Sequence, residues 1–113
     1  MTRWLASHLN DYNLAYLHLI RGDILQKQKG DIITPVRTHY KGILIGNQGY
    51  TPQEAEYAVK EGIVDAIAFG VPFIANPDLP LRIKNKAPLN QANPARFYTS
   101  GPEGYTDYPF WQP

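Results

Sequence analysis

The chain has 113 residues, of which 43% are hydrophobic and 19% charged, the composition of one ordinary globular domain rather than of a disordered chain. Its 11 basic and 10 acidic side chains form no basic stripe of the kind that binds nucleic acid, and there is no cysteine for a disulfide or a sulfur-based zinc site. No apolar run reaches the roughly 18 residues of a membrane span and the start lacks a signal-peptide pattern, so we expect a cytoplasmic protein with no membrane or nucleic-acid partner.

The first third of the chain alternates between helix and strand patterns. Apolar side chains recur at helical spacing from residue 4 and predict a short helix that ends near residues 10–13. The compact apolar run 14–20 predicts a buried strand, and the polar, glycine-marked stretch 21–31 predicts a loop. Residues 32–40 can hold only a short helix, because Pro35 fits best in a first turn.

A second buried strand, over residues 42–46, leads through a glycine turn into a helix with a complete set of start signals. Thr51 is a natural N-cap, Pro52 suits the first helical position, and Glu54 completes a capping box with the cap residue. Gly62 is placed to end this helix in the left-handed conformation. The side chains expected on the buried face of the helix are Ala55, Ala58 and Val59.

A third apolar run, over residues 63–70, predicts a third strand. Strands that are apolar on both faces and alternate with helices are typical of a parallel sheet covered by helices. Three parallel strands keep two bare edges, so we expect part of a larger α/β sheet or barrel. Most of the prolines lie in the last third, which should be rich in loops, with Asn76 or Asp78 capping one more helix that has Pro77 or Pro80 in its first turn.

Glycine turns follow the second and third predicted strands. The carboxyl ends of parallel strands form the functional face of such folds, and a helix N-terminus there offers unpaired N–H groups. Gly46 allows the backbone to approach a ligand, Asn47 and Gly49 tolerate positive φ, and Gly70 repeats the pattern after the third strand. These residues leave two interpretations open, namely a site for a phosphate-like anion or turns that only reverse the chain.

Other polar side chains indicate little chemistry. Arg21 and Asp23 follow the first strand, either as ligand contacts or as a solvated pair on a loop. The three histidines, His8, His18 and His39, have no spacing that suits a metal, so no metal site is expected.

Five motifs, taken together in chain order, resemble the C-terminal part of the old yellow enzyme family. These proteins are FMN-dependent NADH:flavin oxidoreductases of the N-ethylmaleimide reductase and alkene reductase kind. The resemblance covers nearly the whole chain from Leu14 onward. The motifs are LAYLHLIRGD, YKGILIGNQGYTPQEAE, DAIAFGVPFIANPDLPLRI, APLN and FYTSGPEGYTDYP.

The resemblance implies an α/β fold, the C-terminal part of a TIM (β/α)8 barrel. The three strands would be the sixth to eighth of that barrel, with flanking helices and a loop-rich tail. Since an ordinary barrel needs about 250 residues, this chain resembles less than half of one. We therefore expect residues 1–113 to form a single partial barrel domain, with its core over residues 4–86 and an irregular tail over 87–113.

The resemblance also implies FMN as cofactor, NAD(P)H as reductant and an activated alkene as substrate. Backbone groups of Gly46 and Asn47 in one turn, and of Gly70 and Val71 in the next, would hold the flavin phosphate. Tyr98 would line the substrate pocket. The groups that grip the substrate and the tyrosine that donates a proton belong to earlier strands in the family, so no catalytic residue is expected in this chain and it should be inactive by itself.

One departure from the family pattern concerns the cofactor. Many members carry an arginine, paired with the phosphate, where this chain has Val71. A hydrogen bond to a charged group is worth roughly 1.5–3 kcal/mol, so FMN binding should be about ten- to a hundredfold weaker unless Arg82, Lys84 or a backbone nest compensates. The alternatives to an enzyme portion are a non-catalytic remnant, a partner-dependent fragment that associates through its bare sheet edges, and a small phosphate-binding module.

Overall fold

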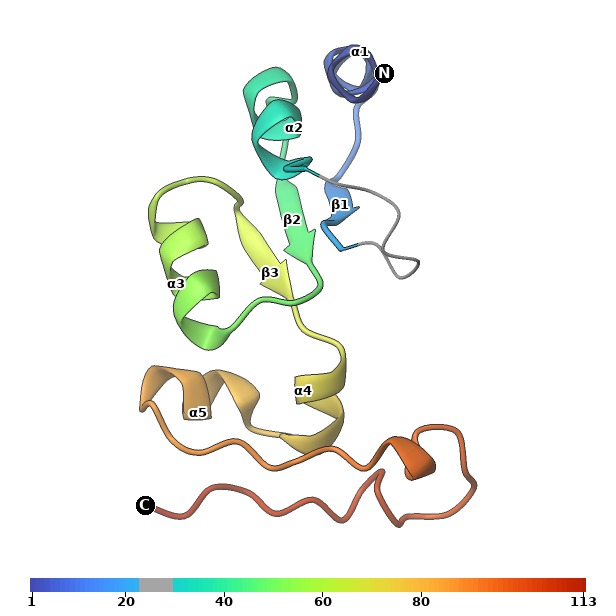
Figure 1. The fold of residues 1–113 in the computed structure, drawn as a ribbon, viewed down its shortest axis with the longest axis vertical. Helices are drawn as coiled ribbons and strands as arrows, with labels where there is room; N and C mark the ends of the chain where they lie inside the picture. Colours follow the sequence, from blue (N-terminus) through green and yellow to red (C-terminus); the bar gives the residue numbers. More distant parts are fainter. Residues whose placement is uncertain (23–29) are drawn as a thin grey trace. The chain divides into compact units, whose positions relative to one another are not determined.

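Three parallel strands form the sheet of the computed structural model, which describes residues 1–22 and 30–113 (Figure 1). The strands are β1 (Leu17–Ile20), β2 (Leu44–Asn47) and β3 (Ala66–Ala68), and β2 lies in the middle. The three predicted strands and their parallel arrangement are confirmed, although each strand is shorter than its apolar run. Asp23 and most of the predicted loop 21–31 lie outside the described residues.

The described chain divides into two units, residues 1–68 and residues 69–113. The prediction of a single partial domain stays a prediction, and each unit is treated by itself below. The first unit holds the sheet and its helices, whose bounds are α1 (Thr2–His8), the 3₁₀ turn η1 (Leu9–Asp11), α2 (Ile33–His39) and α3 (Pro52–Lys60). The second unit holds α4 (Val71–Ala75), α5 (Leu79–Lys84) and the 3₁₀ turn η2 (Pro94–Arg96).

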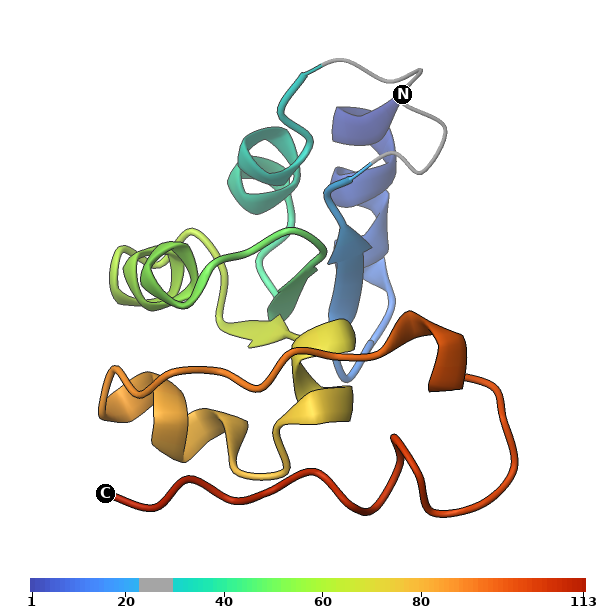
Figure 2. The same ribbon diagram turned by 60° about the horizontal axis from the view of Figure 1, so that its bottom comes forward.

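In the first unit, the helices pack on one face of the sheet (Figure 2). The core joins Ala6 of α1, Val36 of α2 and Ala58 of α3 to Leu44 of β2. Side chains alternate between the two faces of a strand, so the neighbours of each inward-facing residue point the other way. The strand residues that face the helices are Leu17, Leu19, Leu44, Gly46 and Ile67.

The opposite face of the sheet is open within the first unit, so the prediction that the strands are buried on both faces is wrong. Ile20 is 53% exposed, and His18 and Ala66 are exposed as well. In a complete barrel, this open face would line the barrel interior, where the other strands cover it. Its apolar residues would then be buried. Three strands by themselves leave that face without its cover.

Helix α3 confirms the sequence signals at both of its ends. The Thr51 hydroxyl accepts a hydrogen bond from the Glu54 N–H, and the Glu54 carboxylate accepts one from the Thr51 N–H, so the capping box is complete. Gly62 has a φ of +67°, as expected of a residue that ends a helix. The predicted buried position of Val59 is wrong, because it is 44% exposed while Ala58 faces the core.

The second unit begins with a short helix that the sequence analysis missed. Helix α4 starts at Val71 with Pro72 in its first turn, immediately after the last apolar run. The predicted helix farther along is confirmed as α5, with Asp78 at its N-cap position and Pro80 in its first turn. The Asp78 carboxylate makes no capping bond there, since it binds the N–H of Trp111 and the guanidinium of Arg82 instead.

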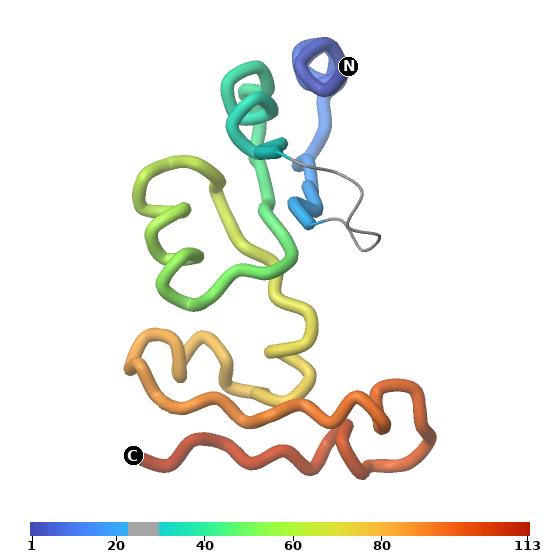
Figure 3. Tube along the Cα trace, viewed as in Figure 1, coloured from blue at the N-terminus to red at the C-terminus, as the bar shows by residue number. Residues whose placement is uncertain are grey.

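The C-terminal segment returns alongside residues 87–93 (Figure 3). The side chain of Asn90 donates to the carbonyl of Pro109, and the N–H of Asn93 donates to the hydroxyl of Tyr108. Apart from η2, residues 87–113 contain no helix or strand, in agreement with the predicted irregular tail. No helix among the described residues is both long and apolar enough to cross a membrane.

Candidate functional site

The turn after β2 starts one residue later than the sequence suggests. Gly46 and Asn47 lie inside β2 and have register partners on both sides, in β1 and in β3. The backbone groups of a central strand are used by the two ladders that flank it. Gln48 and Gly49 follow the last paired residue and form the turn itself, with φ values of +75° and +70°. The backbone groups that lie beyond the ladders therefore begin at Gln48.

Gly46 is a glycine because Tyr50 packs against it. A Cβ at this position would lie 2.9 Å from the Tyr50 hydroxyl and 3.2 Å from Cδ1 of Ile67. A side chain at this position would require the ends of the Tyr50 and Ile67 side chains to shift. Packing within the first unit thus gives a reason for glycine at this position that involves no ligand.

Arg21 binds the turn from the side of β1. Its N–H donates to the Asn47 carbonyl at 3.1 Å, its Nε to the Gln48 carbonyl at 2.9 Å and its Nη2 to the Gly49 carbonyl at 2.6 Å. The guanidinium carbon lies 3.6 Å from the centre of the Tyr50 ring, in cation–π geometry. The sequence left two interpretations of Arg21 open, a ligand contact or a solvated loop pair with Asp23. The structure shows instead that Arg21 holds the turn at residues 48–50, and we call this side chain the brace of the turn.

The positive charge of Arg21 is nearly balanced by the negative charge of Glu54. Nη2 of Arg21 lies 3.3 Å from Oε2 of Glu54. The N–H of Thr51, together with the nearby Arg21, holds the pKa of the Glu54 carboxyl below its usual value. Burial raises the pKa of the Tyr50 phenol although Arg21 acts in the opposite direction, so Tyr50 is a neutral phenol at pH 7. The turn is therefore stabilised by an ion pair that leaves little excess charge.

The side chain of Asn47 lies on the open face of the sheet. Its Nδ2 is 3.0 Å from Nε2 of His18, on the neighbouring strand. These two groups form a small polar site next to Ile20, on the face that a complete barrel would enclose. The histidine was considered only as a metal ligand in the sequence analysis, and the structure gives it this partner instead.

The second predicted turn lies in the other unit. Gly70 is the N-cap residue of α4, and its carbonyl accepts hydrogen bonds from Phe73 and Ile74. A Cβ on Gly70 would meet no described atom within 4 Å, and Val71 is 52% exposed. The backbone here is open to solvent within its own unit, in contrast to Gly46. The combination of the two turns into one phosphate grip stays a prediction.

Arg82, one of the candidates to replace the missing phosphate arginine, is occupied in the interior of the second unit. Its guanidinium donates to Asp78 at 2.7 Å, to the Pro88 carbonyl at 2.6 Å and to the Pro109 carbonyl at 2.8 Å. Burial opposes the charge of Asp78, but the N–H of Trp111 and the guanidinium outweigh it and lower the pKa of this carboxyl. With Arg82 only 3% exposed, its role is to hold the returning tail.

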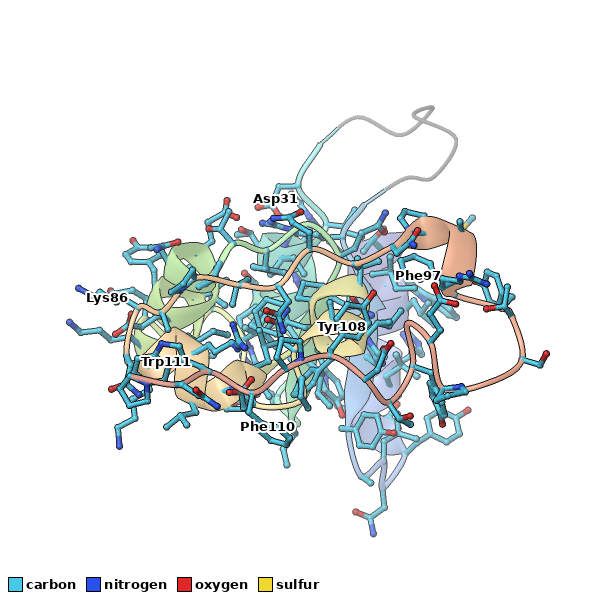
Figure 4. The ribbon with its side chains drawn as sticks, turned by 90° about the horizontal axis from the view of Figure 1, so that it is seen from below. Asp31, Lys86, Phe97, Tyr108, Phe110 and Trp111 are labelled. Carbon is cyan, nitrogen blue, oxygen red and sulfur yellow. The ribbon has the colours of Figure 1, made fainter. Side chains whose placement is uncertain are left out.

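The tail carries the residue predicted to touch substrate. Tyr98 follows Phe97, which lies far from Trp111 in Figure 4. The Tyr98 side chain is 98% exposed, with its ring edge-to-face against Phe97 at 6.5 Å between ring centres. Tyr98 is thus available to a ligand, and its predicted place in a substrate pocket stays a prediction.

Comparison with known proteins identifies the family. No model in a scan of protein families matches the chain. A probable flavin mononucleotide-dependent alkene reductase of Leishmania infantum is 42% identical over 110 residues, a match that spans 97% of this chain and 30% of that protein. The old yellow enzyme of Trypanosoma cruzi matches in structure with a TM-score of 0.92 and 44% identity, over 98% of this chain and 29% of that one. The chain belongs to the old yellow enzyme family.

A second structural match is to a complex with a nicotinamide nucleotide. Morphinone reductase in complex with tetrahydroNAD matches with a TM-score of 0.84 and 39% identity, over 98% of this chain and 30% of the other. The chain thus spans about 30% of the length of the relatives it matches. The predicted C-terminal portion of an old yellow enzyme barrel is confirmed by these matches and by the parallel sheet.

Two residues of the candidate site escaped the sequence analysis. Gln48 and Tyr50 both belong to the predicted glycine turn, and neither is a candidate site residue in the sequence analysis. A signal for the brace was present, because in adjacent parallel strands the residues that follow the strand ends become neighbours. The register of Ile20 with Asn47 places Arg21 next to Gln48. In this member of the old yellow enzyme family, the brace shapes the turn after β2.

Proposed function

We propose that this chain is the C-terminal portion of an FMN-dependent, NAD(P)H-using alkene reductase and supplies part of the FMN phosphate site and one wall of the substrate pocket. The observation that carries the proposal is the 42% identity to the flavin mononucleotide-dependent alkene reductase over 97% of this chain. Since the chain spans 30% of that relative, turnover would require polypeptide that provides the other part of the barrel.

In this proposal, the residues of the chain bind and orient the cofactor. FMN, when bound, supplies hydride transfer between NAD(P)H and an activated alkene. The predicted contacts to its phosphate are Gly46 and Asn47 in one turn and Gly70 and Val71 in the other. The pairing of β2 on both sides favours donors in the first turn that lie beyond the ladder, at Gln48 and Gly49.

The open face of the sheet favours part of a larger barrel, completed by further strands, rather than a free-standing module. Within the first unit, Ile20 and Ala66 are exposed on that face, and both sheet edges belong to strands of three or four residues. Exposed apolar strand surface of this kind promotes association. The partner in this proposal is the polypeptide that forms the missing strands, and self-association is the competing outcome.

A gain-of-function variant tests the phosphate site. Val71→Arg restores the cation that many family members carry, and the exposed position accommodates the longer side chain. We expect FMN to bind about ten- to a hundredfold more tightly to Val71→Arg, because a charge-assisted hydrogen bond is gained. Riboflavin, which lacks the phosphate, should bind with unchanged affinity. The dissociation constants are measured by quenching of flavin fluorescence.

A matched control separates a specific contact from a change in net charge. Val59→Arg adds the same charge at another exposed valine, on α3, and should leave the FMN affinity within about twofold of the unmodified chain, because exposed charges are screened. Equal gains from the two variants, or equal binding of FMN and riboflavin by every variant, would exclude a phosphate site at Val71.

A further inference from the structure

Arg21 holds three consecutive carbonyl groups, an arrangement that reaches beyond simple stabilisation. The acceptors are the carbonyls of Asn47, Gln48 and Gly49, and the donors are the N–H, Nε and Nη2 of the same arginine. The bond to Asn47 comes from the main chain of residue 21, so the arginine side chain itself determines the orientation of two successive peptide units, those that carry the Gln48 and Gly49 carbonyls. The two hydrogen bonds of the guanidinium are short, at 2.9 Å from Nε to the Gln48 carbonyl and 2.6 Å from Nη2 to the Gly49 carbonyl, as expected for donors that carry charge.

The orientation of the carbonyls determines the orientation of the N–H groups. Each peptide unit is planar and trans, with its N–H directed opposite to its C=O, and no cis peptide bond occurs among the described residues. Since the three carbonyls point toward Arg21, the N–H groups of Gln48, Gly49 and Tyr50 point away from it. Successive N–H groups presented by a turn form a concave site for an anion, known as a nest.

The conformation of the turn explains why it needs a brace. Gln48 and Gly49 both have positive φ, which glycine adopts readily and which glutamine rarely does. A strained backbone of this kind persists only when its surroundings hold it. Arg21 is itself immobilised by the Tyr50 ring at 3.6 Å and by Glu54 at 3.3 Å. The turn and its brace therefore form one preorganised unit.

We propose that Arg21 is the positioning residue of the phosphate turn, whose side chain orients the N–H groups of Gly49 and Tyr50 toward the phosphate without contacting it. This inference rests on the proposed function for the identity of the anion. The orientation of the N–H groups is a property of the chain that can be measured without a ligand.

The first unit contains a matched control for a purely structural arginine. Arg37 has the same kinds of partners as Arg21, with Nη1 2.9 Å from Asp65 and Nη2 donating to the carbonyls of Tyr40 and Gly42. These contacts lie at the amino-terminal end of β2, whereas those of Arg21 lie at its carboxyl end. Lysine keeps the charge at either position but lacks the planar fork that reaches several carbonyls at once.

The experiment compares Arg21→Lys, Arg21→Gln and Arg37→Lys in the full chain. Dissociation constants for FMN and riboflavin come from fluorescence quenching, and N–H residual dipolar couplings of residues 48–50 report the orientation of the turn. We expect Arg21→Lys and Arg21→Gln to weaken FMN binding on the order of tenfold, to spare riboflavin and to change the couplings, because the donors are no longer aligned. Arg37→Lys should change neither quantity.

The outcomes discriminate between the possible roles. If Arg21→Lys binds FMN normally while Arg21→Gln does not, the arginine acts through its charge and the positioning role is wrong. Equal losses in Arg21→Lys and Arg37→Lys would also overturn it, as would unchanged couplings in Arg21→Lys. If the unmodified chain does not prefer FMN to riboflavin, the proposed function fails, whereas the couplings still decide whether Arg21 orients the turn.

Discussion

Replacement of Gly46 by alanine tests the packing beneath the candidate site. The added methyl group would lie 2.9 Å from the Tyr50 hydroxyl, 3.2 Å from Cδ1 of Ile67 and 3.3 Å from Cε2 of Tyr50. All three distances are below ordinary van der Waals contact between carbon or oxygen and carbon. Because Gly46 lies in the central strand, its backbone has little freedom to move away. We therefore expect Gly46→Ala to destabilise the first unit.

The magnitude follows from two opposing effects. Overpacking of a filled core costs about 1–3 kcal/mol. Alanine in a strand is more favourable than glycine by roughly 0.5–1 kcal/mol, because it has less backbone entropy to lose. The net expectation for Gly46→Ala is a loss of about 1 kcal/mol in the free energy of unfolding. The closest contact involves only the phenolic oxygen of Tyr50, so Tyr50→Phe in the same chain should restore about half of that loss.

Urea unfolding measures these differences. Trp4 lies in the first unit and Trp111 in the second, so a Trp111→Phe background assigns the tryptophan fluorescence to the first unit. The variants Gly46→Ala, Tyr50→Phe and the double variant complete a cycle, with the urea dependence of the free energy compared to confirm a common unfolding reaction. Gly70→Ala, followed through Trp111 in a separate Trp4→Phe background, is the control, because nothing lies within 4 Å of the added methyl group.

The result that would refute the packing argument is specific. Additive effects of Gly46→Ala and Tyr50→Phe would mean that the added methyl group does not meet the Tyr50 hydroxyl. A loss in Gly70→Ala as large as that in Gly46→Ala would show that any β-carbon in a glycine turn is harmful, whatever its neighbours.

Three further changes test other parts of the chain. Thr51→Ala removes the N-cap hydroxyl of α3 and should lower the free energy of unfolding by about 1 kcal/mol in urea, whereas Thr51→Ser should be nearly neutral. The Leu44 N–H, and then Arg37, lower the pKa of Asp65, so its stabilising effect is present above the unfolded-state value of 3.8 and is lost as the pH falls through the lower folded-state value. Asp65→Asn should therefore flatten the acid decline of stability, and an unchanged acid profile would contradict this. Arg82→Lys cannot keep all three hydrogen bonds and should release the tail. The measurement is the rate of limited proteolysis within the segment that follows Pro109, which should rise. Equal cleavage rates would show that other contacts hold the tail.

Local sequence signals determined those elements whose cause is local. The capping box at Thr51 and Glu54, and the left-handed residue at Gly62, depend only on neighbours along the chain, and both occur as expected. The short helix at Val71 was missed because its apolar residues continue the pattern of the preceding strand. Five ordered motifs were enough to indicate the old yellow enzyme family, which the comparisons then confirmed.

The candidate site depended on contacts that no local pattern contains. The sequence placed a glycine turn at the end of a strand, but only the pairing of β2 with both neighbours moved the unpaired backbone to Gln48 and Gly49. The same pairing brought Arg21 to that turn from a position 27 residues earlier than Gln48. The sequence determines which donors and acceptors each residue carries. Strand register determines which of them become partners, because it decides which distant residues become neighbours.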